Sequence, residues 1–363
     1  MNTKSYILIL LLLLSGCAMR FKKSYIYQKP HSFRNNIFRD SVSVIWSTKL
    51  RNYPEKIINL NQNQVIIGDS RGGLMVMELH DGKKIDRYWK DYIRPVRLYD
   101  IIDNTLYFSS KNEKEIIAWN LKKGQIKWKR KYKTEFTHLF KLAQKYYVRH
   151  ERGLFQIDTA QGKLQEKLTT RTNLVENQLL WNNKILLITE KGTILFADPA
   201  LSIERKYNTG IRLIKNSVLK NNLLAIHNSS GLFKIVNLKN GKTIFNRNFK
   251  RTIYSAPIFN DNWIMIPFAD GEILAFDYKR DEIKWNFSYP ALLNLDCILL
   301  KNKLIVPYAD GTIFCIHSGN GSKIWEYQAE KSINYVKLTH QGLLYSHDKK
   351  LNLIRNKHET PED

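Results

Sequence analysis

The sequence predicts an all-β protein in which eight copies of one four-stranded unit close into a ring, an eight-bladed β-propeller of four-stranded antiparallel blades. Three observations lead to this fold class. One short phrase of glycine, apolar residues and an aromatic recurs along most of the chain. The middle strands of the repeated unit are apolar on both faces. The strand that the last copy lacks is found ahead of the first copy.

The repeated phrase is clearest in two copies. It runs Gly271-Glu-Ile-Leu-Ala-Phe-Asp277 and then Asp281-Glu-Ile-Lys-Trp285, and again Gly311-Thr-Ile-Phe-Cys-Ile-His317 and then Gly321-Ser-Lys-Ile-Trp325. The copies start at positions 73, 115, 153, 192, 231, 271, 311 and 350. A regular step of about 40 residues is the signature of a repeat architecture such as a propeller.

Each copy is expected to form four strands. In the seventh copy we predict strands over Asn294–Leu299, Lys303–Tyr308, Gly311–His317 and Ser322–Gln328. The Asp-Gly and Asn-Gly pairs between them are hairpin signals, because glycine accepts the positive φ that tight turns need. Middle strands such as Ile273–Phe276 are apolar at consecutive positions. That pattern is typical of strands covered on both faces by neighbouring sheets.

The two ends of the chain predict that the ring is closed. The eighth copy supplies Ile333–Lys337, Gly342–His347 and Lys350–Arg355, and it then lacks a fourth strand. The missing strand precedes the first copy, where Val44-Ile45-Trp46 matches Ile126-Lys127-Trp128. Residues 42–49 should therefore complete the last blade and cover an exposed edge. This organisation assigns residues 42–355 to the propeller and residues 356–363 to a C-terminal tail.

The first residues have the pattern of a secretory signal. The apolar run Tyr6–Leu14 is shorter than the about 20 residues that span a bilayer, and it fits the h-region of a signal peptide. It ends in Leu14-Ser15-Gly16-Cys17, which resembles the lipobox of bacterial lipoproteins. The resemblance implies that residues 1–16 are removed and that the Cys17 thiol carries lipid. An ordinary signal peptide with a chance cysteine is the alternative. Ala18 stands where an aspartate would retain a lipoprotein in the inner membrane, so we expect the periplasmic face of the outer membrane.

Basic residues are abundant in the leader and in the whole chain. Residues 17–41 are rich in Lys and Arg and predict a lipidated basic tether, either a plain flexible leader or one attracted to anionic headgroups. The chain has 58 Lys and Arg against 33 Asp and Glu, a formal net charge of +25. This charge indicates either compositional bias or an acidic partner, lipopolysaccharide phosphates or anionic lipid. Nucleic acid is not expected as a partner in the periplasm.

The recurring phrase resembles the repeat of pyrroloquinoline-quinone-type propellers over about residues 42–355. With the lipobox and the short tether, the chain is similar to the BamB-type lipoproteins of the β-barrel assembly machinery. This resemblance implies a non-catalytic outer-membrane scaffold. It would dock on the POTRA domains of a BamA-like barrel protein, act with other assembly lipoproteins and aid insertion of outer-membrane proteins. The alternatives are a propeller lipoprotein of another envelope complex and a quinoprotein-type enzyme, because propellers host unrelated functions.

The residues give little support to the enzyme alternative. Quinoproteins of this superfamily use a calcium ion and often adjacent cysteines, whereas Cys297 and Cys315 are separated and no acidic cluster suits calcium. We place these cysteines on the first and third strands of one unit, about 9–10 Å apart and beyond disulfide reach, as small buried residues. The histidine spacings give no metal motif, and the repeated tryptophans are expected to stack between blades. We therefore expect no catalytic residue, cofactor or metal site.

The candidate partner-binding residues follow from the resemblance alone. In the BamB-type family, contacts to the barrel subunit lie in the connections entering blades four and five, with a Leu-x-Leu-Arg stretch and an acidic residue. Counting back from the fourth and fifth copies places these near Thr170–Asn173 and near position 212. The predicted partner-binding residues are Arg171, Asn173, Arg212 and Leu213. Only an arginine is retained and the acidic position is basic, so the interface has changed with its partner or the partner differs.

Overall fold

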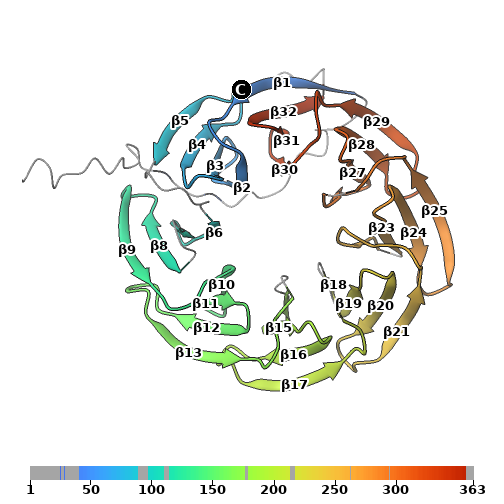
Figure 1. Cartoon of the computed structure of the whole chain (residues 1–363), viewed down its shortest axis with the longest axis horizontal. Helices are drawn as coiled ribbons and strands as arrows, with labels where there is room; N and C mark the ends of the chain where they lie inside the picture. The colour runs from blue at the N-terminus through green and yellow to red at the C-terminus, as the bar shows by residue number, and fades with distance from the viewer. Residues whose placement is uncertain are drawn as a thin grey trace, which may run out of the picture.

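The computed structural model describes residues 25, 28, 41–88, 97–109, 114–175, 179–212, 217–261, 263–293 and 295–356. These residues form eight four-stranded antiparallel sheets, arranged as blades around a ring (Figure 1). The predicted fold class is therefore confirmed. The predicted signal peptide, Cys17 and most of the predicted tether lie outside the described residues. Within the described ranges, no helix is long and apolar enough to cross a membrane.

Blades are numbered in chain order, and the first strand of each lies nearest the ring centre (Figure 1). Blades 1 to 4 contain β2 Pro54–Asn59, β3 Gln64–Asp69, β4 Leu74–Glu78, β5 Lys84–Tyr88; β6 Arg97–Ile102, β7 Thr105–Ser109, β8 Glu115–Asn120, β9 Gln125–Lys131; β10 His138–Leu142, β11 Lys145–His150, β12 Gly153–Ile157, β13 Leu164–Thr169; and β14 Leu179–Trp181, β15 Lys184–Ile188, β16 Thr193–Ala197, β17 Ile203–Asn208. Blades 5 to 8 contain β18 Val218–Lys220, β19 Leu223–His227, β20 Leu232–Asn237, β21 Thr243–Asn248; β22 Ile258–Phe259, β23 Ile264–Pro267, β24 Glu272–Asp277, β25 Glu282–Ser288; β26 Ile298–Leu300, β27 Lys303–Pro307, β28 Thr312–His317, β29 Lys323–Gln328; and β30 Tyr335–Thr339, β31 Gly342–His347, β32 Lys350–Asn356, β1 Val42–Lys49.

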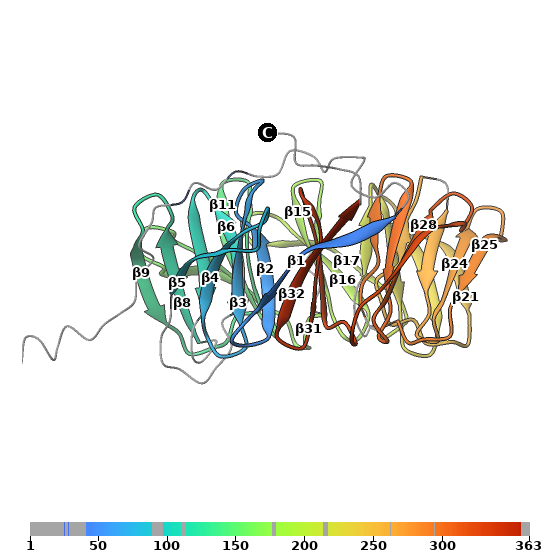
Figure 2. The same ribbon diagram turned by 90° about the horizontal axis from the view of Figure 1, so that it is seen from above.

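Strand β1 closes the ring. It pairs antiparallel with β32, from Val42 opposite Asn356 to Lys49 opposite Lys350, and it lies along the outer edge of blade 8 (Figure 1, Figure 2). The sheet order β1-β32-β31-β30 joins sequence-distant segments in one blade. The prediction that residues 42–49 complete the last blade is confirmed, and β32 reaches one residue beyond the predicted end of the propeller.

The middle strands carry the core. Every residue of β7 is buried, and β16 and β28 are each buried at all but one terminal position. The outer strand β25 differs, because only its Trp285 is fully buried. Neighbouring blades cover both faces of the middle strands, whereas the fourth strands form the outer wall of the ring.

The first strands are shorter than, or shifted from, the predicted ones. In blade 7 we expected Asn294–Leu299, whereas β26 spans only Ile298–Leu300, and residue 294 lies outside the described residues. The chain ahead of β26 is held by the neighbouring blade instead, because the Leu293 N–H donates to the Ala269 carbonyl of blade 6 at 3.3 Å. In blade 8, β30 starts at Tyr335, two residues after the start of the predicted strand Ile333–Lys337.

The seams between neighbouring blades are fastened at one repeated group. We call it the seam carbonyl: the backbone carbonyl just after the third strand of a blade, which faces the preceding blade. Three indoles from fourth strands donate to it: Trp46 Nε1 to Leu79 O at 2.7 Å, Trp128 Nε1 to Thr159 O at 2.7 Å, and Trp285 Nε1 to Ser318 O at 3.1 Å. The tryptophans at these positions therefore stack between blades, as predicted, and they also bond across the seam.

Each of these indoles lies against a glycine in the next blade. Gly82 and Gly162 sit in the turns between the third and fourth strands of blades 1 and 3, both with φ of +69°. A Cβ at Gly82 would come within 2.5 Å of the Trp46 ring, and one at Gly162 within 2.7 Å of the Trp128 ring. A larger residue would push the indole away from the seam carbonyl.

Two other seams use different donors. Between blades 4 and 5, the Arg205 guanidinium donates to the Leu238 carbonyl at 2.7 Å and lies 4.1 Å from the centroid of the Phe196 ring. Between blades 3 and 4, the Tyr147 hydroxyl donates to the Pro199 carbonyl at 2.6 Å. The acceptor is thus retained while the donor changes.

Replacing Trp128 with alanine should destabilise the ring, because the change removes a buried side chain and the donor to the Thr159 carbonyl. We expect the free energy of unfolding to fall by about 3–5 kcal/mol, and by less for Trp128→Phe, which keeps most of the packing. Urea unfolding followed by circular dichroism measures both. The control is Ile126→Ala, an exposed position on the same strand, where the change should stay within about 0.5 kcal/mol. Unchanged stability of Trp128→Ala would contradict this role of the seam carbonyl.

Candidate partner-binding site

Three of the four predicted partner-binding residues lie on one face of the ring. We call it the loop face: it is formed by the links between successive blades and by the turns between second and third strands. Arg171 follows β13 in the link from blade 3 to blade 4, and Arg212 follows β17 in the link from blade 4 to blade 5. Both side chains are exposed, and Asn173 is half-buried. The structure therefore places these three residues on adjacent links of one face, while residue 213 lies outside the described residues.

The link that carries Arg171 is fixed to both blades that it joins. The Thr170 N–H donates to the Arg152 carbonyl at 2.8 Å, and the Thr170 hydroxyl donates to the Thr172 carbonyl at 2.7 Å. On the side of blade 4, the Glu190 N–H donates to the Asn173 carbonyl at 2.9 Å. The exposed Arg171 side chain therefore extends from a backbone that is already ordered.

Asn173 has a partner within the molecule. Its side-chain oxygen accepts a hydrogen bond from Arg152 Nε at 3.0 Å. Arg152 belongs to the turn between the second and third strands of blade 3, and Lys191 is exposed at the equivalent turn of blade 4. Sequence reasoning missed both of these cations, because it searched only the links between blades. The loop face here therefore carries more positive charge than the prediction included.

The link that carries Arg212 repeats the same construction. The Thr209 N–H and hydroxyl both donate to the Gly192 carbonyl, at 2.9 and 2.8 Å. From blade 5, Lys234 Nζ donates to the Thr209 carbonyl at 2.6 Å. A Cβ at Gly192 would lie 1.8 Å from the Ile211 carbonyl oxygen, so the glycine lets the link fold over the turn. Arg212 is thus presented from a fixed backbone as well.

A second group of basic residues lies on the innermost strands. Lys56, Arg97 and His138 occupy equivalent ladder positions on β2, β6 and β10. Burial, and then the charges of Arg149 and of Lys56 and Arg97, lower the pKa of His138 to about 4, so this imidazole is neutral at pH 7. Burial lowers the pKa of Lys56, which Asp100 opposes. The available signal in the sequence was the spacing of positions 56, 97 and 138, which matches the repeat step of about 40 residues.

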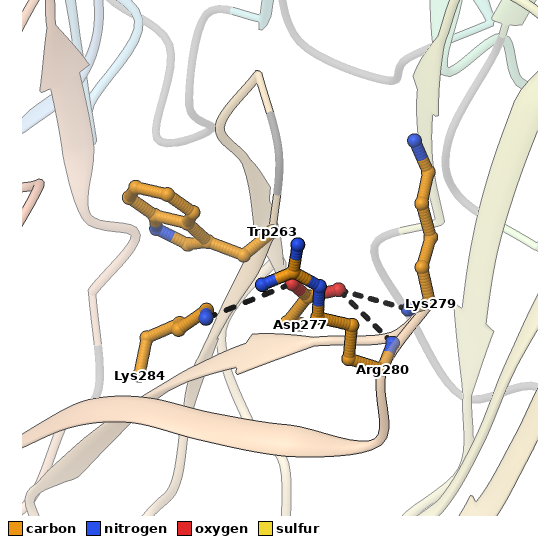
Figure 3. A pocket seen from close by; sticks show the side chains of 5 residues that line it. All are labelled: Trp263, Asp277, Lys279, Arg280 and Lys284. Carbon is orange, nitrogen blue, oxygen red and sulfur yellow. Dashed lines mark hydrogen bonds and ion pairs between the residues drawn. The ribbon is translucent and has the colours of Figure 1, made fainter.

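Blade 6 has a basic cavity of about 390 Å³ at the face opposite the loop face. Its lining residues are Trp263, Asp277, Lys279, Arg280 and Lys284 (Figure 3). The Asp277 carboxylate accepts hydrogen bonds from the backbone N–H groups of Lys279 and Arg280, at 3.0 and 3.2 Å. Burial acts to raise the pKa of Asp277, but these hydrogen bonds and the nearby cations outweigh it, so the pKa lies below its usual value. The carboxylate is thus engaged in holding the turn between β24 and β25.

The two propeller cysteines are free thiols. Cys315 lies on β28 and is buried, which raises its pKa to about 12. Cys297 was predicted as a buried residue on a first strand. It precedes β26 by one residue, because that strand starts later than predicted, and its side chain is half-buried. Over the described part of the chain, no group of three or more His, Cys, Asp or Glu side chains is arranged to hold a metal ion.

Comparisons with known proteins bear on the fold and on the class. Residues 200–339 match a family model described as outer membrane protein assembly factor BamB. No curated protein matches the chain. The crystal structure of BamB from Moraxella catarrhalis is similar with a TM-score of 0.67 and 15% identity, covering 87% of this chain and 100% of that chain.

Two further solved structures have the same architecture. The computationally designed Ika8 protein matches with a TM-score of 0.68 and 13% identity, over 88% of this chain and 100% of that chain. Sqt1 from Saccharomyces cerevisiae matches with a TM-score of 0.69 and 12% identity, over 88% of this chain and 99% of that chain. At such identities the likeness concerns the fold alone.

The chain is thus an eight-bladed β-propeller. More narrowly, its residues 200–339 form a BamB-type domain, and the resemblance found in the sequence is confirmed at that level.

Removing the Thr170 hydroxyl should loosen the link from blade 3 to blade 4 without unfolding the ring. Thr170→Val deletes the donor to the Thr172 carbonyl in a buried position. We expect the Leu174 amide, which donates to the Glu151 carbonyl at 2.8 Å, to exchange its hydrogen several-fold faster, while amides of the middle strands stay protected. The matched control is Thr169→Val at the exposed neighbouring position. Equal exchange at Leu174 in both variants would contradict a role for the hydroxyl.

Proposed function

We propose that this chain is a non-catalytic lipoprotein scaffold of the β-barrel assembly machinery, held by lipid on Cys17 at the periplasmic face of the outer membrane. In this role it docks through its loop face on the POTRA domains of a BamA-like barrel protein. It acts there with other assembly lipoproteins to aid folding and insertion of outer-membrane proteins. The observation that carries the proposal is the match of residues 200–339 to the BamB family model, joined to the lipobox at the start of the sequence.

The construction of the loop face supports a docking role. The link that carries Arg171 is bonded to blade 3 through Thr170 and to blade 4 through Asn173. The link that carries Arg212 is bonded to blades 4 and 5 through Thr209. A preorganised surface loses little conformational entropy on binding, so more of the contact energy remains as affinity. Exposed cations such as Arg171 and Arg212 favour a partner surface with acidic residues.

Reversing charge at the two links should weaken partner binding. For Arg171→Glu with Arg212→Glu, we expect at least about tenfold weaker association, or about 1.4 kcal/mol, because exposed cations become acids. Affinity capture from detergent-extracted membranes measures the barrel protein that is retained, and circular dichroism checks the ring. Lys163→Glu with Lys239→Glu is the matched control, since these exposed lysines lie on turns of the opposite face. Equal capture with both double variants would refute this interface.

The lipid anchor has its own test. Cys17→Ala should move the protein from the outer-membrane fraction to the soluble periplasm, because several acyl chains give stable anchoring that the ring itself does not supply. Cell fractionation and incorporation of labelled palmitate measure this. Retention of Cys17→Ala in the outer membrane would show that the lipid is dispensable.

A scaffold in another envelope complex is the second candidate. It is favoured by Arg212, a basic and exposed residue where the resemblance implies an acidic one. The same capture experiment separates the two, because this candidate predicts copurification of envelope proteins that lack POTRA domains.

A further inference from the structure

By the leader we mean residues 17–41, of which Tyr25 lies in the seam between blades 1 and 2. Tyr25 is only 5% exposed and packs in an apolar cluster with Leu60 and Leu121. Its N–H donates to the Leu121 carbonyl at 2.7 Å, and its hydroxyl donates to Asp86 Oδ2 at 3.1 Å. Further along, the Gln28 N–H donates to the Leu60 carbonyl at 3.0 Å. The contacts therefore involve both blades.

Asp86 stands where other seams have their donor. On β5 it occupies the ladder position that Trp128 occupies on β9 and Trp285 occupies on β25. The Asp86 carboxyl accepts a hydrogen bond here through Oδ2, whereas the indole at the other seams donates one. The seam carbonyl of blade 2 is Leu121 O, and at this seam the side chain at the usual position cannot serve it.

Tyr25 supplies what Asp86 cannot. Its backbone N–H donates a hydrogen bond to the Leu121 carbonyl, and its ring packs in the apolar cluster between the blades. Burial, and then the charge of Asp86, raise the pKa of the Tyr25 hydroxyl above its usual value, so the hydroxyl stays protonated and remains a donor to that carboxylate. Tyr25 thus supplies both a donor to the seam carbonyl and an aromatic ring that packs between the blades.

We propose that the seam between blades 1 and 2 is a docking site for the chain's own leader, with Tyr25 in place of the missing tryptophan, and that this docking sets which wall of the ring faces the membrane. The second half rests on the proposed lipidation of Cys17.

The sequence limits how far the ring can lie from the lipid. Cys17 and Tyr25 are eight residues apart. A segment of that length spans at most about 29 Å when fully extended. The side of the ring formed by blades 1 and 2, which includes β5 and β9, is therefore held within this distance of the lipid. Lys127 and Lys131 are exposed on β9, and cations at a membrane surface are attracted to anionic lipid headgroups.

Hydrogen exchange of the full lipidated chain in detergent micelles tests the docking. The amides of Tyr25 and Gln28 should exchange at least about tenfold more slowly in the wild type than in Tyr25→Ala. Asp86→Trp restores an indole at the seam and should displace the leader, exposing both amides while amides of the middle strands stay protected. Wild-type exchange at the rate of an unstructured peptide overturns the docking, as does unchanged protection in Asp86→Trp. If that variant does not fold, the comparison with Tyr25→Ala decides alone.

Two matched labels test the orientation. Ile126 and Ile283 are exposed at equivalent ladder positions on β9 and β25, on opposite sides of the ring (Figure 1). In a background of Cys297→Ser and Cys315→Ala, Ile126→Cys and Ile283→Cys each carry a fluorophore in vesicles of phosphatidylglycerol with a quencher lipid. We expect several-fold stronger quenching at position 126, and a smaller difference when Tyr25→Ala is added. Equal quenching with protected leader amides overturns the orientation. A Cys17 without lipid, seen by mass spectrometry, overturns the proposed anchor and leaves the docking result intact.

Discussion

The contacts between blades depend on one acceptor, the seam carbonyl, which blades 1 to 5 and blade 7 each offer to a donor at the seam with the preceding blade. Ladder hydrogen bonds hold the strands within a blade, but they do not join one blade to the next. A buried carbonyl left without a donor costs about 1–3 kcal/mol, so the seam needs a donor even where the tryptophan is absent. An indole from Trp46, a guanidinium from Arg205 and a phenol from Tyr147 meet this need at different seams. The carbonyl acceptor is common to these seams, whereas the side chain that donates to it differs from seam to seam.

Strand β1 closes the ring, so that the separate seams belong to one continuous structure. Because β1 pairs with β32, residues from both ends of the propeller share a blade, and the eight blades form a closed ring. On the loop face, Thr170 and Thr209 donate hydrogen bonds that hold successive links against neighbouring turns. A face built in this way suits the proposed scaffold, because its exposed side chains extend from a backbone that is held in place.

Most of the fold could be predicted from the sequence, because strand pattern, turns and repeat step are local signals. The closure by residues 42–49 was also predictable, since it needed only a comparison of the two ends. Contacts between distant positions were not: nothing local marks Arg205 as a seam donor or Tyr25 as a partner of Asp86. The short first strand β26 likewise reflects a bond to the neighbouring blade rather than its own residues. The proposed roles of Arg171 and Arg212 could not be derived from this chain alone, because they concern contacts with a proposed partner.

Crosslinking in native membranes is the direct test of the proposed docking through the loop face. A lysine-reactive reagent, capture of this chain and mass spectrometry identify both the partner and the face that it contacts. We expect links from loop-face lysines such as Lys191 and Lys250 to a POTRA-bearing barrel protein. Links only from Lys163 and Lys239 on the opposite face, or capture of a complex without such a protein, would contradict it.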